Sequence, residues 1–105
     1  MSEVLPIWVA VLRLDLTVPG ARSLKDRRQV VRSLKERLAN KFGAAVAEVG
    51  DLESWSRATL AAALVSNDKA ELEERTESLV RYARRDADAL VGEVEKDVFR
   101  YGGDG

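Results

Sequence analysis

The sequence predicts an α+β fold in which four strands and two helices follow one another in the order βαββαβ. Three observations lead to this prediction. The chain has 105 residues, which suits a single domain (1–105) with one core over about residues 7–99. The spacing of its apolar residues changes repeatedly between a strand period and a helix period. Turn and cap residues separate the segments.

The first strand is expected at Ile7–Leu16, which is rich in β-branched residues and almost continuously apolar. Such a run is typical of a central strand that is covered on both faces. Pro19 and Gly20 follow it and mark a turn.

The first helix is predicted over Ser23–Phe42, with Ser23 as the N-cap and Gly43 as the C-cap. Asp26 in the first turn suits the positive end of the helix dipole. The apolar stripe consists of Leu24, Val31, Leu34, Leu38 and Phe42.

A short second strand is expected at Ala44–Gly50 and a loop at Asp51–Ser54. In Trp55–Ser66 both sets of alternating positions are largely apolar, so both faces of this strand should be covered and it is predicted to be a second central strand. Asp68 and Glu71 have the spacing of a capping box and predict the start of another helix, which ends at about Arg85. Its apolar stripe is Leu72, Thr76, Leu79 and Ala83.

The last strand, Ala89–Phe99, is predicted to have one wet face. Leu90, Val94 and Val98 are expected on the core side, and Glu93, Glu95 and Asp97 on the other side. Residues 102–105 are expected to form a flexible tail.

This element order is that of the ferredoxin-like sandwich, a four-stranded antiparallel sheet of strand order 4-1-3-2 with both helices on one face. The uncovered face should present Trp8 or its alternate neighbours, with small apolar residues from Ala58–Val65. An apolar patch of this kind predicts a homodimer or higher oligomer that packs through the open sheet face. The alternative is a monomer with a mildly apolar, alanine-rich face.

The composition excludes many kinds of chemistry. The chain has no cysteine and no histidine, so disulfides, thiol nucleophiles, imidazole bases and most zinc sites are ruled out. We therefore predict no enzymatic activity, no catalytic residues, no cofactor and no metal. The N-terminal segment lacks a basic cluster before its apolar run, which predicts a cytoplasmic location and no membrane span.

The charges are segregated along the chain. Residues 22–41 carry eight basic and two acidic side chains, whereas the formal net charge of the whole chain is −1. The first helix is thus a cationic element on an anionic protein. A cationic row of this kind can contact several phosphates of a nucleic-acid strand. The residues predicted to bind RNA are Arg22, Lys25, Arg27, Arg28, Arg32 and Lys35.

Other interpretations of the same residues remain open. The basic run can be a solvated helix face whose charges pair with the acidic second helix. The RNA-recognition motif shares the βαββαβ order but stacks bases on sheet aromatics, and no aromatic motif of that kind occurs here. Trp55 can stack a base, or it can cap the core or an oligomer interface.

Catalytic candidates are few. The carboxylates near strand ends are Glu48, Asp51, Glu53 and Asp68, and their spacing is not diagnostic of an acid–base pair or a magnesium site. Acylphosphatases also have this fold and use a loop arginine with an asparagine on the second strand. Arg22 could imitate the arginine, but Ala44–Gly50 contains no asparagine.

Four segments carry a family resemblance: Pro19-Gly20 with Ser23-Leu24-Lys25, Val46–Asp51, Trp55 with Arg57, and Val65–Asp68. Together they resemble the YlxP-like family, small bacterial proteins of unknown function. The resemblance spans about Ile7 to Phe99 and implies a ferredoxin-like fold. It also implies an association with translation, because such genes commonly lie near those for transcription-elongation and ribosome-maturation factors. No catalytic residues follow from it.

The leading hypothesis is therefore a non-enzymatic protein that binds RNA, in a ribosomal setting, through its basic first helix. The alternative is a homo-oligomeric protein-interaction module whose basic helix docks an acidic protein partner. A third and weaker hypothesis is a small phosphate-handling enzyme.

Overall fold

A computed structural model describes residues 5–50 and 54–102 of the chain. Four strands and two helices follow one another in the predicted βαββαβ order. Their bounds are β1 Trp8–Thr17, α1 Leu24–Phe42, β2 Ala45–Gly50, β3 Arg57–Ser66, α2 Lys69–Arg84 and β4 Leu90–Arg100.

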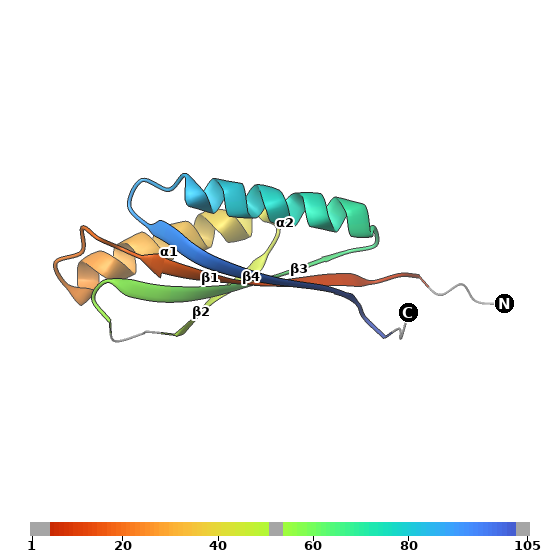
Figure 1. Cartoon of the computed structure of the whole chain (residues 1–105), viewed down its shortest axis with the longest axis horizontal. Helices are drawn as coiled ribbons and strands as arrows, with labels where there is room; N and C mark the ends of the chain where they lie inside the picture. Colours follow the sequence, from red (N-terminus) through yellow and green to blue (C-terminus); the bar gives the residue numbers. More distant parts are fainter. Residues whose placement is uncertain (1–4, 51–53, 103–105) are drawn as a thin grey trace.

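The four strands form one antiparallel sheet in the order β2-β3-β1-β4, which confirms the predicted topology. Both helices lie on the same side of this sheet, and nothing in the described chain covers the other side (Figure 1). The core therefore lies between the helices and one sheet face. It is built mainly from leucines and alanines of β1, β3, α1 and α2.

Alternate residues of β1 and β3 face the helices. In β1 these are the even-numbered positions from Ala10 to Leu16, each at most 2% exposed. Trp8 has the same parity and packs against the core edge, with the Lys69 ammonium 5.3 Å from its ring centroid. The sequence predicts either Trp8 or its alternate neighbours on the open face. The structure places the neighbours there, and Ile7 and Val11 are exposed.

β4 departs from the predicted alternation at its start. The pairing with β1 shifts register, so that Leu14 lies opposite Val94 but Leu16 lies opposite Val91. This irregularity reverses the orientation of the first residues. Leu90, expected on the core side, is 59% exposed, and Val91 packs against the core instead.

The caps of α1 are those that the sequence predicts. The Ser23 hydroxyl accepts the Asp26 N–H at 3.1 Å, and the Asp26 carboxylate in turn accepts the Arg22 N–H at 3.1 Å. At the other end Gly43 adopts a left-handed φ of 64°, and its N–H donates to the Ala39 carbonyl. Such a φ favours glycine because a Cβ atom is disfavoured there.

α2 begins as predicted, with the Asp68 carboxylate accepting the N–H groups of Ala70 and Glu71 at 2.9 and 3.2 Å. Arg75 of this helix joins three elements. Its guanidinium donates to the Phe42 carbonyl at the end of α1 and to the Val65 carbonyl in β3.

Neither helix in the described residues is long and apolar enough to cross a membrane. Most of the predicted tail, residues 103–105, and most of the predicted loop, residues 51–53, lie outside the described residues.

Candidate nucleic-acid interface

Three of the predicted RNA-binding residues meet in one hollow beside α1. Arg28, Arg32 and Lys35 line it together with Val31 and with Glu48 of β2, and its volume is about 240 Å³. Arg28 and Arg32 are exposed, and Lys35 is half-buried. Within the described chain the side chain of none of the three forms an ion pair or a hydrogen bond. Their charges are therefore available to an anion from outside.

Arg27 does not belong to this surface, so the prediction from the sequence that it binds RNA with the others is wrong in placing it there. Its side chain is only 1% exposed. Nε donates to the Arg57 carbonyl at 2.8 Å, and Nη2 pairs with the Glu48 carboxylate. Arg27 thus ties α1 to the end of β2 and the start of β3, and its role is structural.

Glu48 lies between the buried Arg27 and the exposed cations of the hollow. It lies on the helix side of β2, half-buried, with Arg27 on its inner side and the cationic hollow around its outer side. A buried guanidinium requires such a partner, because an unpaired charge in the interior is strongly unfavourable. The sequence offers Glu48 as one of several carboxylates near strand ends, and the structure makes it the ion-pair partner of Arg27.

Two further cations extend the row at the start of α1, Lys25 in the first turn and Arg22 just before the helix, and both side chains are exposed. The predicted anion site at the helix start is partly occupied by the protein itself. Ser23 takes up the Asp26 N–H, and Asp26 supplies a carboxylate at this end of the helix. Arg22 and Lys25 are therefore peripheral cations beside the hollow.

The remaining cations of α1 contact α2. The Arg37 guanidinium donates to the Tyr82 hydroxyl at 3.2 Å and to the Asp86 carboxylate at 2.7 Å. These hydrogen bonds raise the pKa of Arg37 above its usual range. The Lys41 ammonium lies 5.5 Å from the centroid of the Tyr82 ring. The alternative that the basic charges pair with α2 thus holds for Arg37 and Lys41, but not for the hollow.

Asp86 is the anionic partner in this contact. Burial by itself would raise the pKa of its carboxyl group. The hydrogen bonds from Arg37 and from the N–H groups of Asp88 and Ala89 outweigh that effect, so the pKa lies below its ordinary value.

Trp55 lies in the turn before β3 and is 60% exposed. It is absent from the residues that pack against the core, which removes the core-capping interpretation. The turn itself is fixed, because the Ser54 hydroxyl accepts the N–H groups of Ser56 and Arg57 at 3.3 and 3.0 Å.

The open sheet face offers no aromatic platform on its central strands. The described residues that point there from β1 and β3 are aliphatic at one end of the strands and polar at the other. At the polar end the Arg13 guanidinium lies 3.6 Å from the Asp15 carboxylate and 3.7 Å from the Glu95 carboxylate. Phe99, an exposed aromatic of β4, pairs with Val9 at the sheet edge. Base stacking on the sheet, as in an RNA-recognition motif, therefore has no counterpart here.

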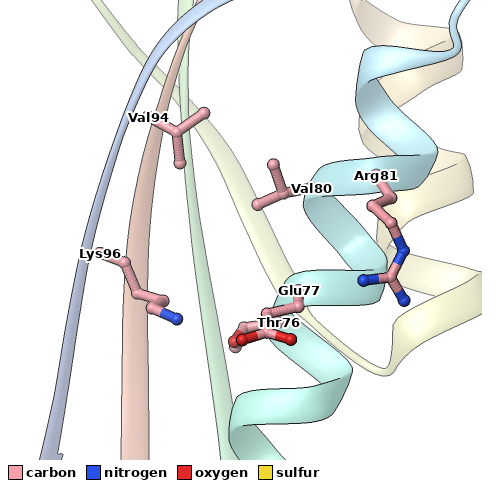
Figure 2. A pocket seen from close by; sticks show the side chains of 6 residues that line it. All are labelled: Thr76, Glu77, Val80, Arg81, Val94 and Lys96. Atoms are coloured by element: carbon pink, nitrogen blue, oxygen red, sulfur yellow. The ribbon is translucent and has the colours of Figure 1, made fainter.

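A larger hollow, of about 390 Å³, lies between α2 and β4. Figure 2 shows Val80 and Val94 facing each other across it, with Lys96, Glu77 and Arg81 around them. Both signs of charge are present, so this hollow does not extend the basic surface. Among the residues the structure describes, no three carboxylates are grouped as ligands for a metal ion.

The sequence does contain a signal for the role of Arg27. The apolar stripe of α1 has an interval of seven between Leu24 and Val31, and Arg27 fills the missing position three residues after the first and four before the second. In β2, Glu48 likewise has the same parity as Val46, which packs against the core. Two opposite charges at buried positions of neighbouring elements indicate an internal ion pair.

Comparison with known proteins relates the chain to proteins without an assigned function. A family model described as "Protein of unknown function (DUF503)" matches residues 9–96. The "Uncharacterized protein YlxP" of Bacillus subtilis (strain 168) is 29% identical over 68 residues, which cover 65% of this chain and 74% of that protein.

Two designed proteins are similar in structure. "De novo designed protein Foldit4" is 14% identical, with a TM-score of 0.52 over 89% of this chain and 96% of that chain. "De novo designed protein Ferredog-Diesel" is also 14% identical, with a TM-score of 0.44 over 85% of this chain and 83% of that chain. The likeness to Foldit4 concerns the fold alone.

Proposed function

Since the chain belongs to the DUF503 family of proteins of unknown function, to which the YlxP-like resemblance pointed, we propose its role from its own surface: it is a non-enzymatic RNA-binding protein. The binding surface is the basic face, defined as Arg22, Lys25, Arg28, Arg32 and Lys35. A ribosomal setting and the cytoplasmic location expected from the sequence are part of this proposal.

The observation that carries the proposal is that the cations of α1 separate into two groups. Arg27 and Arg37 are engaged by carboxylates inside the protein. The side chains of the basic face form no ion pair with any described residue. A protein whose net charge is −1 thus keeps a patch of uncompensated positive charge on one side. Such a patch attracts a polyanion and releases its counterions on binding.

The row from Arg28 to Lys35 is about 10 Å long at ~1.5 Å of rise per residue. A linear array of phosphates can follow it, whereas a single small anion would use only part of it. The hollow beneath the row supplies a groove between α1 and the edge strand β2.

Charge reversal tests this function. The double variant Arg28→Glu/Arg32→Glu should bind RNA at least about tenfold more weakly, because two phosphate contacts become repulsive. The affinity is measured by fluorescence anisotropy with a labelled RNA at low salt.

A matched control instead reverses one cation of α2 and the cation at its C-cap. Arg81→Glu/Arg85→Glu changes the net charge by the same amount at exposed positions away from the basic face. This variant should keep most of the affinity. Equal losses in the two variants would show a response to net charge alone and would contradict the proposed site.

The open sheet face supports a second candidate function, a homo-oligomeric protein-interaction module whose basic face docks an acidic protein. One half of this face is apolar over β1, β2 and β3, where Val11 and Val65 are 41% and 61% exposed, and Asp97 of β4 lies beside it, opposite Val11. Val11 and alanines of β2 and β3 line a shallow hollow of about 280 Å³ in it. The occupant that fits is a second copy of the chain, because a sheet whose strands have 10, 6, 10 and 11 residues covers roughly 600 Å² in plane. That is the order of the ~800 Å² per partner in a stable interface.

A further inference from the structure

We infer that the basic face takes single-stranded rather than double-stranded RNA, with phosphates along Arg28, Arg32 and Lys35 and one base stacked on Trp55. This inference rests on the proposed function and adds the form of the nucleic acid and a residue outside α1.

The first support is the exposure of Trp55. A tryptophan with 60% of its surface in solvent has apolar area to offer to a partner. Trp8 provides the contrast, since it packs against the core edge under Lys69. Of the two tryptophans, Trp55 alone therefore presents a largely open ring system.

The second support is that the turn carrying Trp55 is fixed to the rest of the fold. Ser54 accepts two N–H groups within the turn, and the Ser56 carbonyl accepts the Val18 N–H at 2.7 Å. A ring presented on a fixed turn loses little conformational freedom when a base stacks on it.

The third support is the position of this turn beside α1. Arg27 Nε lies 2.8 Å from the Arg57 carbonyl, so α1 and the start of β3 touch at this point. Trp55 precedes that contact by two residues, about 7 Å of extended chain, and Arg28 follows Arg27 in α1. Figure 1 shows the start of α1 and the start of β3 at the same end of the molecule. Trp55 therefore lies at the end of the molecule where the row from Arg28 to Lys35 begins.

A cationic groove with an aromatic ring at its end is the arrangement by which proteins bind single strands without reading sequence. Every base has a π-face that can stack, so the contact tolerates any sequence. In a duplex the bases are stacked on one another and offer no free face to Trp55. The chemistry of the site therefore favours a single strand.

The test uses Trp55 as its own probe. In the Trp8→Phe variant, Trp55 is the single tryptophan of the chain. Its fluorescence is followed during titration with a 12-nucleotide single-stranded RNA, a 12-base-pair RNA duplex and inorganic polyphosphate. The single strand should quench the emission, whereas polyphosphate, which has no bases, should bind without quenching.

Affinity provides the second readout. Trp55→Ala should weaken binding of the single strand roughly tenfold, and Trp55→Phe should restore most of the loss because it retains an aromatic ring. Neither substitution should change the affinity for polyphosphate. The melting temperatures should stay close to that of the wild type, since the side chain is exposed.

The outcomes separate this inference from the proposed function. Single-stranded RNA that binds without quenching, or equally well to Trp55→Ala, would overturn the stacking role and leave RNA binding in place. Equal affinity for the duplex and the single strand would overturn the preference. A protein that binds neither RNA at low salt would overturn both the inference and the proposed function.

Discussion

At the scale of the residue, the same side-chain type has two roles in this protein. Arg27 and Arg28 are adjacent in α1, yet the first is buried in an ion pair and the second is exposed in the cationic hollow. Their different roles follow from the helix period, which directs Arg27 toward the sheet and Arg28 toward solvent. Charge alone could not distinguish them in the sequence, and only the gap in the apolar stripe points to Arg27.

Replacement of Arg27 therefore tests its structural role. Arg27→Met should lower the free energy of unfolding by about 3 kcal/mol, because Glu48 and the Arg57 carbonyl lose a charged hydrogen-bond donor. Urea denaturation followed by circular dichroism measures the change. The control is Arg28→Met, which should alter the free energy by no more than about 0.5 kcal/mol. Similar stability in the two variants would contradict the assigned roles.

At the scale of the element, the helix ends are well predicted and the start of β4 is not. Ser23, Gly43 and Asp68 have side chains or backbone conformations that act locally, so the sequence alone identifies them as caps. The register shift in β4 depends on its pairing with β1, a contact between residues far apart in the chain. For that reason the outward orientation of Leu90 could not be predicted from alternation.

The contact between α1 and α2 has a predictable response to acid. The pKa of Asp86 is lowered from its ordinary value of 3.8 in the folded protein. The carboxylate therefore adds stability above that pH, and the contribution disappears as the pH falls through the lower folded value. Asp86→Asn should cost about 1 kcal/mol at pH 7 and progressively less below about pH 4.

Urea denaturation at several pH values between 3 and 7 measures this difference. Asp88→Asn is the matched control, since only the backbone N–H of Asp88 takes part in the network. A difference between wild type and Asp86→Asn that does not change with pH would contradict the role of the carboxylate.

At the scale of the whole molecule, the fold was predictable and the distribution of its surfaces was only partly so. The strand order and the single helical layer follow from the order of the elements and from the two apolar central strands. On β1 and β3, the open sheet face is apolar at one end and charged at the other. The charged end includes Arg13 and Asp15, which interrupt the otherwise apolar sequence of β1. The sequence alone leaves open whether Trp8 points toward the helices or away from them. Alternation along β1 predicts which residues lie on the open face only once that orientation is known.

The apolar half of the sheet yields a prediction about assembly. If a second copy covers it, the protein should be a dimer by light scattering. Val11→Glu should then shift it to a monomer, because the charge would be buried in the interface. Gln29→Glu, at an exposed position of α1 on the helix side of the sheet, serves as a control for added charge. A strictly monomeric wild-type protein at high concentration would contradict the interface.

The salt dependence of RNA binding tests the central claim most directly. If the basic face contacts about four phosphates of a single strand, the logarithm of the association constant should fall with the logarithm of the salt concentration with a slope of about −3. In Arg28→Glu/Arg32→Glu the slope should be about half as steep, because two contacts are lost. A slope near zero for the wild-type protein, or the same slope in both proteins, would contradict the assignment of the basic face as the RNA-binding surface.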